Sequence, residues 1–285
     1  MSEITFGLYR VLGNDLPPRH GEMQTFKNVE FMLDNEYRAD SLTQIFCLNR
    51  IADQAKVSRL KGMLDRAGVQ YITIPFIQQT FDMFEEDSAR IHYLTNLNAA
   101  RNQCIDHGLK QFDVAFILDG ASFFRREGWL PFEELVYRFP EEAVYAVPTH
   151  RAATFEEVLS PNFQPQIRER YEFGGGVVRV GIREPYLAFT SLADVRFDES
   201  LMYGRADKAE LLYRLGFPGV WDAWEPKLRA EASQKMSAFA GTVKSAGWCV
   251  RLPSHSGQGD ESNLQRGHER RIGLSNILRS LKKTA

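Results

Sequence analysis

Short apolar runs alternate with helical patterns through the first half of the chain. Five runs rich in β-forming residues predict strands, at residues 4–10, 43–48, 69–74, 114–118 and 143–147. Three segments between them carry apolar residues at helical spacing and predict helices, over 26–36, 52–67 and 89–108. This alternation predicts an α/β fold, in which a mainly parallel sheet is flanked by helices on both faces.

The alternation loosens after about residue 150. A polar stretch with Pro161 and Pro165 leads into a glycine-rich run at 173–181, and no internal repeat or low-complexity tract is found. We therefore expect one α/β domain over residues 1–220. Residues 221–285 would form a C-terminal helical extension packed on the same domain.

Composition narrows the classes of partner. A net charge of −2 gives no basic field, so we expect no nucleic-acid partner. The three cysteines are widely spaced in apolar contexts, which favours reduced thiols and a cytoplasmic protein. The N-terminus lacks the pattern of a signal peptide and no apolar run is long enough for a membrane span, so any membrane contact would be peripheral.

The position of Asp119 in the sequence suggests a binding site. Asp119 directly follows the apolar run 114–118 and precedes Gly120. Parallel sheets present ligands and metals at the carboxyl ends of their strands, so Asp119 could hold a divalent cation against a diphosphate. The alternative is a plain turn, because Asp-Gly pairs favour turns.

Two further polar clusters could face the same edge. The segment 9–20 follows the first strand and contains two arginines, a histidine and a pair of prolines, so Arg10 or Arg19 could donate to oxyanions. The glycine patterns of a P-loop and of a dinucleotide site are both absent. Asn98, Arg101 and Asn102 share one face of a predicted helix. The alternatives are a solvated turn and a solvent-exposed helix face.

The order of these motifs resembles one enzyme family. Tyr-Arg-Val-Leu-Gly-Asn-Asp-Leu-Pro-Pro-Arg-His, then Leu-Asn-Arg, then Asn-Ala-Ala-Arg-Asn and then Leu-Asp-Gly occur in the order found in nucleotide-sugar-dependent glycosyltransferases of the GT-A fold, of the family 2 type. The resemblance covers roughly residues 4–215. It implies nucleotide contacts at the ends of the first two strands and on the helix, namely Arg10, Asn14, Asp15, Asn49, Arg50 and Arg101.

The resemblance also implies a metal site. The family usually has Asp-x-Asp, whose carboxylates hold Mn²⁺ or Mg²⁺ across the donor diphosphate, but this chain has Ala121 in the second position. Asp119 would be the remaining acidic ligand, and His255 in a polar loop is the best candidate for another, although a loop histidine without a metal is the alternative. Arg266, Arg270 and Arg271 could instead neutralise the diphosphate, unless they form an exposed basic face.

An acceptor hydroxyl must lose a proton, so an inverting enzyme needs a general base. The segment before Leu-x-x-Arg-x-x-Gly resembles the acidic helix start of the family, which implies Asp207 first and Glu210 second. The alternative is an N-terminal capping pattern. A glycine run and several aromatic residues could border a sugar pocket, although a strand bulge and core packing explain them equally well: Gly174, Gly175, Gly176, Trp129, Trp221, Trp224 and Tyr203.

The sequence therefore predicts a glycosyltransferase that moves a sugar from a nucleotide diphosphate donor to a hydroxyl acceptor in glycan or polysaccharide synthesis. Two alternatives remain. One is a catalytically inert module that binds a nucleotide sugar or glycan, and the other is a sugar-phosphate nucleotidyltransferase, whose glycine-rich first loop is missing here. A homo-oligomer is compatible with the sequence, which does not indicate the donor sugar, the acceptor or the stereochemical outcome.

Overall fold

The five predicted strands are present in the computed structural model. It describes residues 3–165, 167–171, 177–181, 183–204, 208–217, 226–253 and 263–283. The predicted strands are β1 (Phe6–Leu12), β2 (Leu42–Asn49), β3 (Gln70–Ile74), β4 (Val114–Asp119) and β6 (Val144–Arg151). The remaining strands are β5 (Ser122–Phe123), β7 (Ile167–Tyr171), β8 (Val177–Gly181), β9 (Arg183–Thr190), β10 (Lys244–Ser245) and β11 (Cys249–Arg251).

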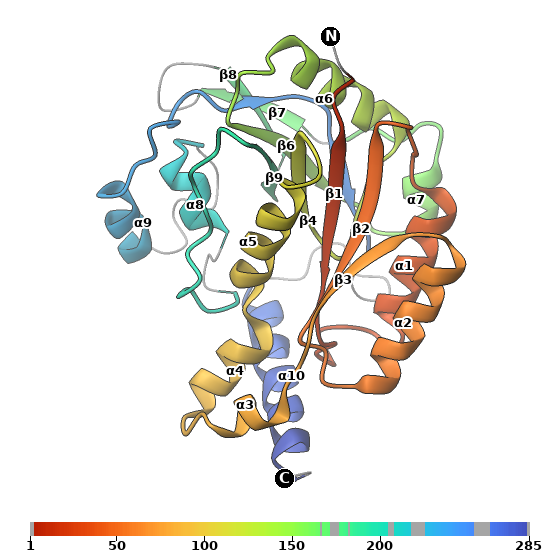
Figure 1. Cartoon of the computed structure of the whole chain (residues 1–285), viewed down its shortest axis with the longest axis vertical. Coiled ribbons are helices and arrows are strands. Elements are labelled where there is room, and N and C mark those ends of the chain that lie inside the picture. The colour runs from red at the N-terminus through yellow and green to blue at the C-terminus, as the bar shows by residue number, and fades with distance from the viewer. Residues whose placement is uncertain are drawn as a thin grey trace.

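Helices connect and cover these strands (Figure 1). The predicted first two helices are α1 (Gln24–Asn35) and α2 (Gln54–Arg66). The others in the described part of the chain are α3 (Gln78–Asp82), α4 (Asp87–Thr95), α5 (Leu97–Gly108), α6 (Arg126–Arg138), α7 (Phe155–Leu159), α8 (Ala209–Arg214), α9 (Pro226–Ser233) and α10 (Asn263–Lys283).

The main sheet has the strand order β3-β2-β1-β4-β9-β6-β11-β5, with β10 also paired to β6. The β1–β2, β2–β3, β1–β4 and β11–β6 pairs are parallel, which confirms the mainly parallel sheet. The sequence pattern did not predict β9, which lies antiparallel between β4 and β6. Because it runs in the opposite direction, β9 begins at the edge where its parallel neighbours end. That edge therefore collects residues from six strands.

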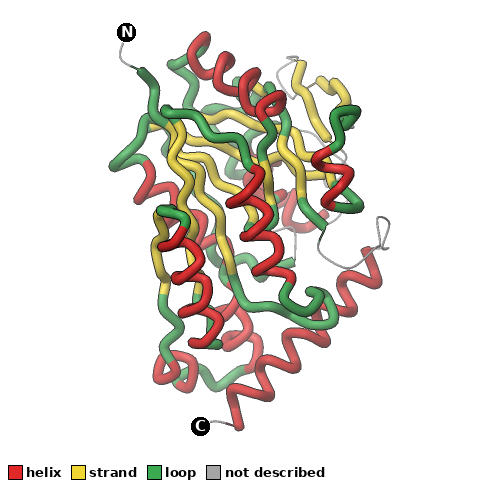
Figure 2. The backbone as a smooth tube through the Cα atoms, turned by 90° about the vertical axis from the view of Figure 1, so that its right-hand side faces the viewer, coloured by secondary structure: helices red, strands yellow, loops and turns green. Residues whose placement is uncertain are grey.

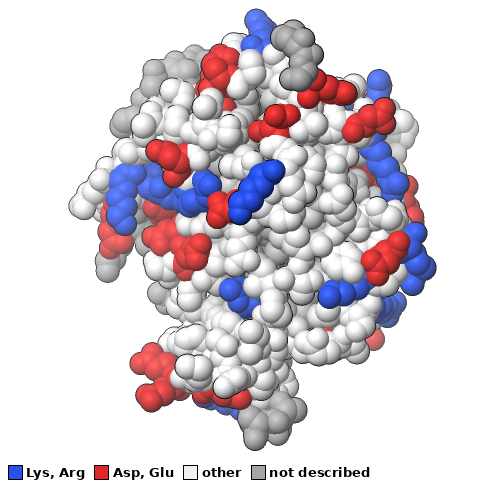
Figure 3. Space-filling view, viewed as in Figure 1, with Lys and Arg blue, Asp and Glu red and all other residues white. Residues whose placement is uncertain are grey.

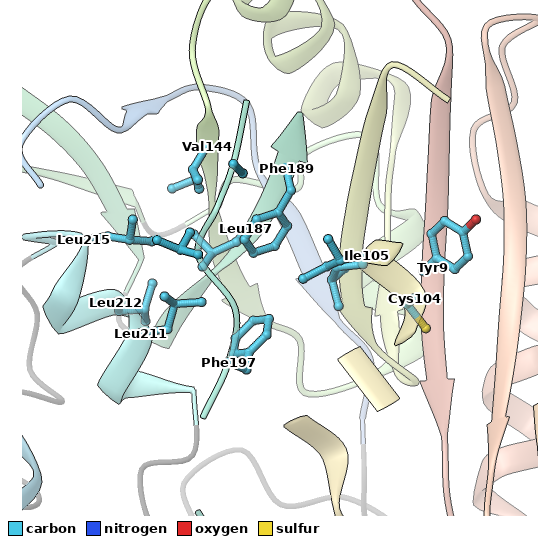
Figure 4. Packing of buried hydrophobic residues seen from close by; sticks show 14 of the residues in the cluster. Tyr9, Cys104, Ile105, Val144, Leu187, Phe189, Phe197, Leu211, Leu212 and Leu215 are labelled. Carbon is cyan, nitrogen blue, oxygen red and sulfur yellow. The ribbon is translucent and has the colours of Figure 1, made fainter. Parts of the chain in front are cut away.

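The sheet is buried on both faces, and Figure 2 shows helices on either side of it. Side chains of β1 alternate between the two faces, as strand geometry requires. Tyr9 and Val11 pack in a cluster with α5 and α8, whereas Phe6 and Leu8 pack with α6, and Leu12 with α1 and α2. Figure 4 shows the first cluster, in which Cys104 and Ile105 of α5 meet Tyr9 and residues of β9.

The single helix predicted over residues 89–108 is wrong. Two helices, α4 and α5, occupy this stretch, and they meet at Asn96. Asn96 has φ −67° and ψ 85°, outside the helical region, and its side chain accepts a hydrogen bond from the backbone N–H of Ala99. Asparagine is a favoured N-cap, so this residue begins a new helix. The break lets α5 lie against the sheet while α4 extends below it (Figure 1).

The C-terminal helix α10 packs beside α4. Leu278 of α10 contacts Phe81 and Leu94 in a small apolar cluster. Gly273 lies so close to Leu16 that a Cβ would approach the Leu16 Cβ to 2.7 Å. This contact brings α10 against the loop that follows β1. No helix in the described residues is both long and apolar enough to span a membrane.

Candidate functional site

A cavity of about 660 Å³ opens at the carboxyl edge of the sheet. Its walls come from the ends of β1, β2, β4, β6 and β11, the start of β9, the loop after β1, and parts of α5 and α10. In Figure 1 these strand ends point down toward α10. Open α/β sheets bind ligands at this edge, and the volume is within the range of about 300–1,000 Å³ typical of small-molecule sites.

The cavity is rich in positive charge. Six cationic side chains line it, from Arg19, Arg101, Arg151, Lys208, Arg251 and Arg270, against three acids, Asp15, Asp119 and Glu184. The whole chain has a net charge of −2, so this excess is local. On the face shown in Figure 3, by contrast, basic and acidic side chains are interspersed. A concave site lined by one sign of charge attracts ligands of the opposite sign.

Asp119 lies at the centre of this charge. One carboxylate oxygen, Oδ1, accepts a hydrogen bond from Arg101 at 3.0 Å. The other, Oδ2, accepts one from the Tyr186 hydroxyl at 3.1 Å, and an Arg251 guanidinium nitrogen lies 3.5 Å away. Both oxygens of Asp119 are therefore already engaged by donors of the protein.

The ionisation of these groups follows from burial and from their neighbours. Burial alone would raise the pKa of Asp119, but the charges of Lys208, Arg101 and Arg251 outweigh it and hold this pKa well below its ordinary value. Burial, together with the charge of Asp119, raises the pKa of the Tyr186 hydroxyl, which therefore stays protonated and can donate. Burial lowers the pKa of Lys208, and Asp119 and Glu184 oppose that shift.

Arg251 and Arg270 each present a donor to the cavity that no described residue accepts. The Nε atoms of Arg251 and Arg270 are buried, and neither has a hydrogen-bond partner among the described residues. Both arginines line the cavity. A buried donor without a partner costs about 1–3 kcal/mol, and more if it is charged. An anionic ligand with several oxygens would supply the missing acceptors.

The polar residues after β1 and β2 fasten two loops together. Asn14 lines the cavity, donates to the carbonyl of Arg50 at 2.8 Å and accepts from the N–H of Ala52 at 2.9 Å. Asn49 is buried at the cavity wall, and its Oδ1 accepts from Arg50 at 2.9 Å. Arg50 itself does not line the cavity and lies over the Tyr93 ring, 5.4 Å from its centroid. The structure thus brings Asn14 and Asn49 to the cavity but not Arg50.

Asp15 belongs to a second network at the cavity wall. Its carboxylate accepts from Lys56 Nζ at 2.7 Å and from the Thr25 hydroxyl at 2.6 Å. His20 Nδ1 accepts from the N–H of Leu16 at 3.0 Å, which assigns the ring proton to Nε2. Burial, only partly opposed by Asp15, lowers the pKa of His20 to about 4. The His20 ring is therefore neutral near pH 7.

The polar stripe on α5 is buried rather than solvent-exposed. Asn98 donates to the carbonyl of Asp198 at 2.7 Å, and Asn102 donates to that of Phe197 at 2.9 Å. These two asparagines fasten the segment before α8 to the helix. Arg101, between them on the same face, reaches Asp119 instead. Of the three residues, Arg101 alone lines the cavity.

Arg10 lies away from the cavity. It is fully buried in an ion pair with Glu36, and its Nε donates to the carbonyl of Ser122 at 2.9 Å. Its position in β1 explains this, because it shares a face with Leu8 and Leu12, toward α1 and α6. The assignment of Arg10 as a nucleotide contact is therefore not supported by its position. Through its hydrogen bond to Ser122, Arg10 fixes the turn that follows Asp119.

The remaining predicted residues divide into three groups. Asp207, His255, the three glycines at 174–176, Trp221 and Trp224 lie outside the described residues, as does the side chain of Arg266. Glu210 is buried, bonded to Arg214 at 2.7 Å, and does not line the cavity. Trp129 of α6 packs in the apolar core, whereas Tyr203 lines the cavity under Arg270.

Sequence reasoning missed several polar residues of the cavity, four of which bear on the proposed function. These four are Glu184 and Tyr186 on β9, Lys208 before α8, and Arg251 at the end of β11. The Glu184 carboxylate is 3.9 Å from Lys208, the one ion pair it makes among the described residues, and it accepts no side-chain hydrogen bond from them. Neither β9 nor β11 was predicted, so nothing marked these side chains as strand-end residues. Only Lys208, next to the conspicuous Asp207, carried a usable signal.

The residues at Asp119 do not fit a divalent cation. Hard cations such as Mn²⁺ and Mg²⁺ need unoccupied carboxylate oxygens, yet those of Asp119 face two arginines and a tyrosine hydroxyl. Among the described residues, no three side chains of His, Cys, Asp or Glu are grouped to hold a metal ion. The cluster has the donors of an anion site.

A scan against protein-family models and a search of curated proteins found no match. Solved structures with a similar arrangement include TarS from S. aureus, at 8% identity and a TM-score of 0.40 over 74% of this chain and 33% of that chain. GalNAc-T7, crystallised with UDP, GalNAc and Mn²⁺, gives 12% identity and a TM-score of 0.43 over 91% of this chain and 46% of that one.

A third similar structure is the mannosyltransferase PcManGT from Pyrobaculum calidifontis in complex with GDP-Man and Mn²⁺. It gives 13% identity and a TM-score of 0.37 over 98% of this chain and 72% of that one. This chain spans about a third of the TarS chain and under half of the GalNAc-T7 chain. Similarity at this level does not establish a shared activity, so function must come from the cavity residues.

Proposed function

We propose that the cavity binds a nucleotide diphosphate sugar and that the protein transfers the sugar to a hydroxyl acceptor. The observation that carries this is the cluster of Arg101, Lys208 and Arg251 around Asp119 at the carboxyl edge of a parallel sheet. The buried Nε donors of Arg251 and Arg270 match an anion with several oxygens. A diphosphate satisfies this better than a carboxylate, because it offers more acceptors and more charge.

The two ends of the cavity suggest the donor's orientation. The loop after β1 and the end of β2 form one wall, with Asn14, Asp15, Asn49 and Arg19. We assign the nucleoside to this wall, since it is rich in amide and carboxylate groups that can bond a base and a ribose. The sugar would then lie toward Glu184 of β9, which is on the far side of β4 from β1 and β2.

Transfer requires a balanced exchange of bonds. The acceptor oxygen forms a bond to the anomeric carbon while the bond from that carbon to the diphosphate oxygen breaks. The leaving diphosphate keeps the electron pair, which the surrounding cations stabilise. The acceptor proton passes to a carboxylate acting as general base. Asp207 remains the proposed base from sequence, and Glu184 is the cavity acid with the loosest contacts in the described residues.

Substituting each acid in turn distinguishes the two candidate bases, Glu184 and Asp207. Glu184→Gln keeps the shape of the side chain but cannot take the proton. If Glu184 is the base, kcat should fall about 100-fold or more with little change in donor affinity. Asp207→Asn is the parallel variant. Loss of turnover in Asp207→Asn alone would assign the proton to Asp207 and remove Glu184 from the proposal.

Nucleoside diphosphates should stabilise the folded protein. Thermal unfolding would be measured with UDP, GDP, CDP and TDP, and with the matching nucleosides. We expect at least one diphosphate to raise Tm, because a ligand at 100 times its Kd adds about 2.7 kcal/mol to the free energy of unfolding. The nucleoside alone should do much less, because it lacks the charged group.

Two arginines of α10 provide the matched control. Arg270 lines the cavity, whereas Arg279 is exposed and, among the described residues, is bonded only within its own helix, to Ser275 and Asn276. Arg270→Met should reduce the diphosphate-dependent shift, and Arg279→Met should leave it unchanged. If no diphosphate raises Tm, the proposed function is wrong. Binding without any transfer to an acceptor would support an inert binding module instead.

A further inference from the structure

The charge around Asp119 has a consequence for how the diphosphate is held. Asp119 occupies the sequence position at which the resembling family places a metal ligand, but its two oxygens are bonded to Arg101 and Tyr186. The residue two positions later is Ala121, which offers no oxygen from its side chain. A metal ion at Asp119 would have to displace two arginines and a buried tyrosine hydroxyl.

The cations themselves already lie where such an ion would act. Arg101 comes from α5, Lys208 from the start of α8 and Arg251 from β11, so three separate elements converge on one carboxylate. Lys208 Nζ lies over the Tyr186 ring, 4.2 Å from its centroid. Three fixed positive charges exceed the two negative charges of Asp119 and Glu184. The cluster thus keeps a net positive charge before any ligand enters.

Asp119 has a clear use in this arrangement. Three cations packed together repel one another, and a carboxylate between them holds them in place until an anion arrives. A chain of hydrogen bonds fixes the Asp119 carboxylate itself. Tyr186 donates to it, and the Ser122 hydroxyl donates to Tyr186 at 2.7 Å. Ser122 is in turn anchored through its carbonyl by Arg10.

We infer that the protein binds its donor diphosphate directly through Arg101, Lys208 and Arg251, in place of a divalent cation, and that Asp119 positions these cations. This rests on the proposed function. It assigns to side chains the neutralisation of the leaving group, which a metal ion supplies in other sites of this kind.

A binding titration with and without metal tests the inference. Calorimetry would measure the Kd of the preferred nucleoside diphosphate in EDTA and again with excess Mn²⁺. We expect the two Kd values to agree within about threefold, because the charges that hold the diphosphate are covalently attached. Binding only with Mn²⁺ would overturn the inference and leave the proposed function intact. No binding under either condition would overturn both.

The direction in which one substitution changes Kd distinguishes direct binding by the cations from binding through a metal ion. Asp119→Asn removes a negative charge from the cluster but keeps an amide oxygen that can still accept from Arg101 or Tyr186. Once the diphosphate supplies the negative charge that holds the cations together, the variant should bind it in EDTA at least as tightly as the wild type. A metal ligand at this position predicts the opposite, a Kd raised about tenfold or more that Mn²⁺ cannot restore. Arg251→Met should raise Kd about tenfold or more with or without Mn²⁺.

A measurement of how much Mn²⁺ the protein binds completes the test, and it does not depend on activity. Paramagnetic resonance of free Mn²⁺ would be recorded with protein and diphosphate together, and with the diphosphate alone. We expect the protein to remove no more Mn²⁺ than the diphosphate does. One Mn²⁺ bound per protein, and lost in Asp119→Asn, would contradict the inference. If Asp119→Asn proves unfolded by circular dichroism, the wild-type and Arg251→Met titrations still decide.

Discussion

Replacing Lys208 by methionine should lower kcat/KM for sugar transfer by about 100-fold or more. Lys208 is buried, and its charge acts on Asp119. In the proposed mechanism its ammonium group would meet the charge that develops on the leaving diphosphate. Methionine preserves the length of the side chain but removes that charge. The loss should appear in kcat as well as in donor affinity, because the leaving group is more negative in the transition state than in the bound donor. Steady-state kinetics with saturating acceptor would measure it.

Lys244 offers a matched control for this variant. It also lies over an aromatic ring, that of Phe139 at 4.7 Å, and it is paired with Glu142 at 3.0 Å. It does not line the cavity. Lys244→Met should therefore leave kcat/KM within about twofold of the wild type. Equal losses in the two variants would show that removal of a lysine that lies over an aromatic ring, rather than its place in the cavity, explains the effect.

The second large effect is on stability. Arg10→Met should lower the free energy of unfolding by about 3–5 kcal/mol, because it leaves the Glu36 carboxylate buried without its cation. Glu36 is fully buried, and it also accepts from the N–H of Phe124 at 2.7 Å and from Gln44 at 2.9 Å. Denaturant unfolding would measure the loss. Glu36→Gln should cost a similar amount, since it leaves the Arg10 guanidinium unpaired.

The double variant and a surface pair make this prediction specific. Arg10→Met with Glu36→Gln should cost less than the sum of the single variants, because neither charge is then left without its partner. Arg196 and Asp106 form an exposed pair at 2.8 Å, and Asp106→Asn should cost no more than about 1 kcal/mol. Additive effects at Arg10 and Glu36 would contradict a coupled buried pair.

The fold was largely predictable because most of its strands are buried on both faces. β1, β2, β4 and β6 are almost wholly buried, and such strands appear in sequence as continuous apolar runs. The parallel arrangement then follows from the helices between them. β9 was not predicted, and Glu184 and Pro185 interrupt its apolar pattern at the start. An antiparallel strand inserted in a parallel sheet also leaves no signal in the order of elements.

The candidate site was predictable only where it follows a predicted strand. Asp119 was expected at the edge because it ends a clear apolar run, and Arg101 because it shares a helix face with two asparagines. Asn49 was expected there only because the family resemblance implied it. Lys208, Arg251 and Glu184 reach the cavity from segments far apart in sequence, which only the folded chain brings together. Strand alternation places Arg10 on the face opposite Tyr9 and Val11, but its burial in an ion pair with Glu36 could not be read from the sequence.

A crystal structure of the protein with its preferred nucleoside diphosphate tests the central claim most directly. The account predicts diphosphate oxygens within hydrogen-bonding distance of Arg251 and Lys208, with the nucleoside against the loop after β1. It further predicts that the Nε donors of Arg251 and Arg270 acquire acceptors. A diphosphate bound elsewhere on the molecule, with Arg101, Lys208 and Arg251 still gathered only around Asp119, would contradict it.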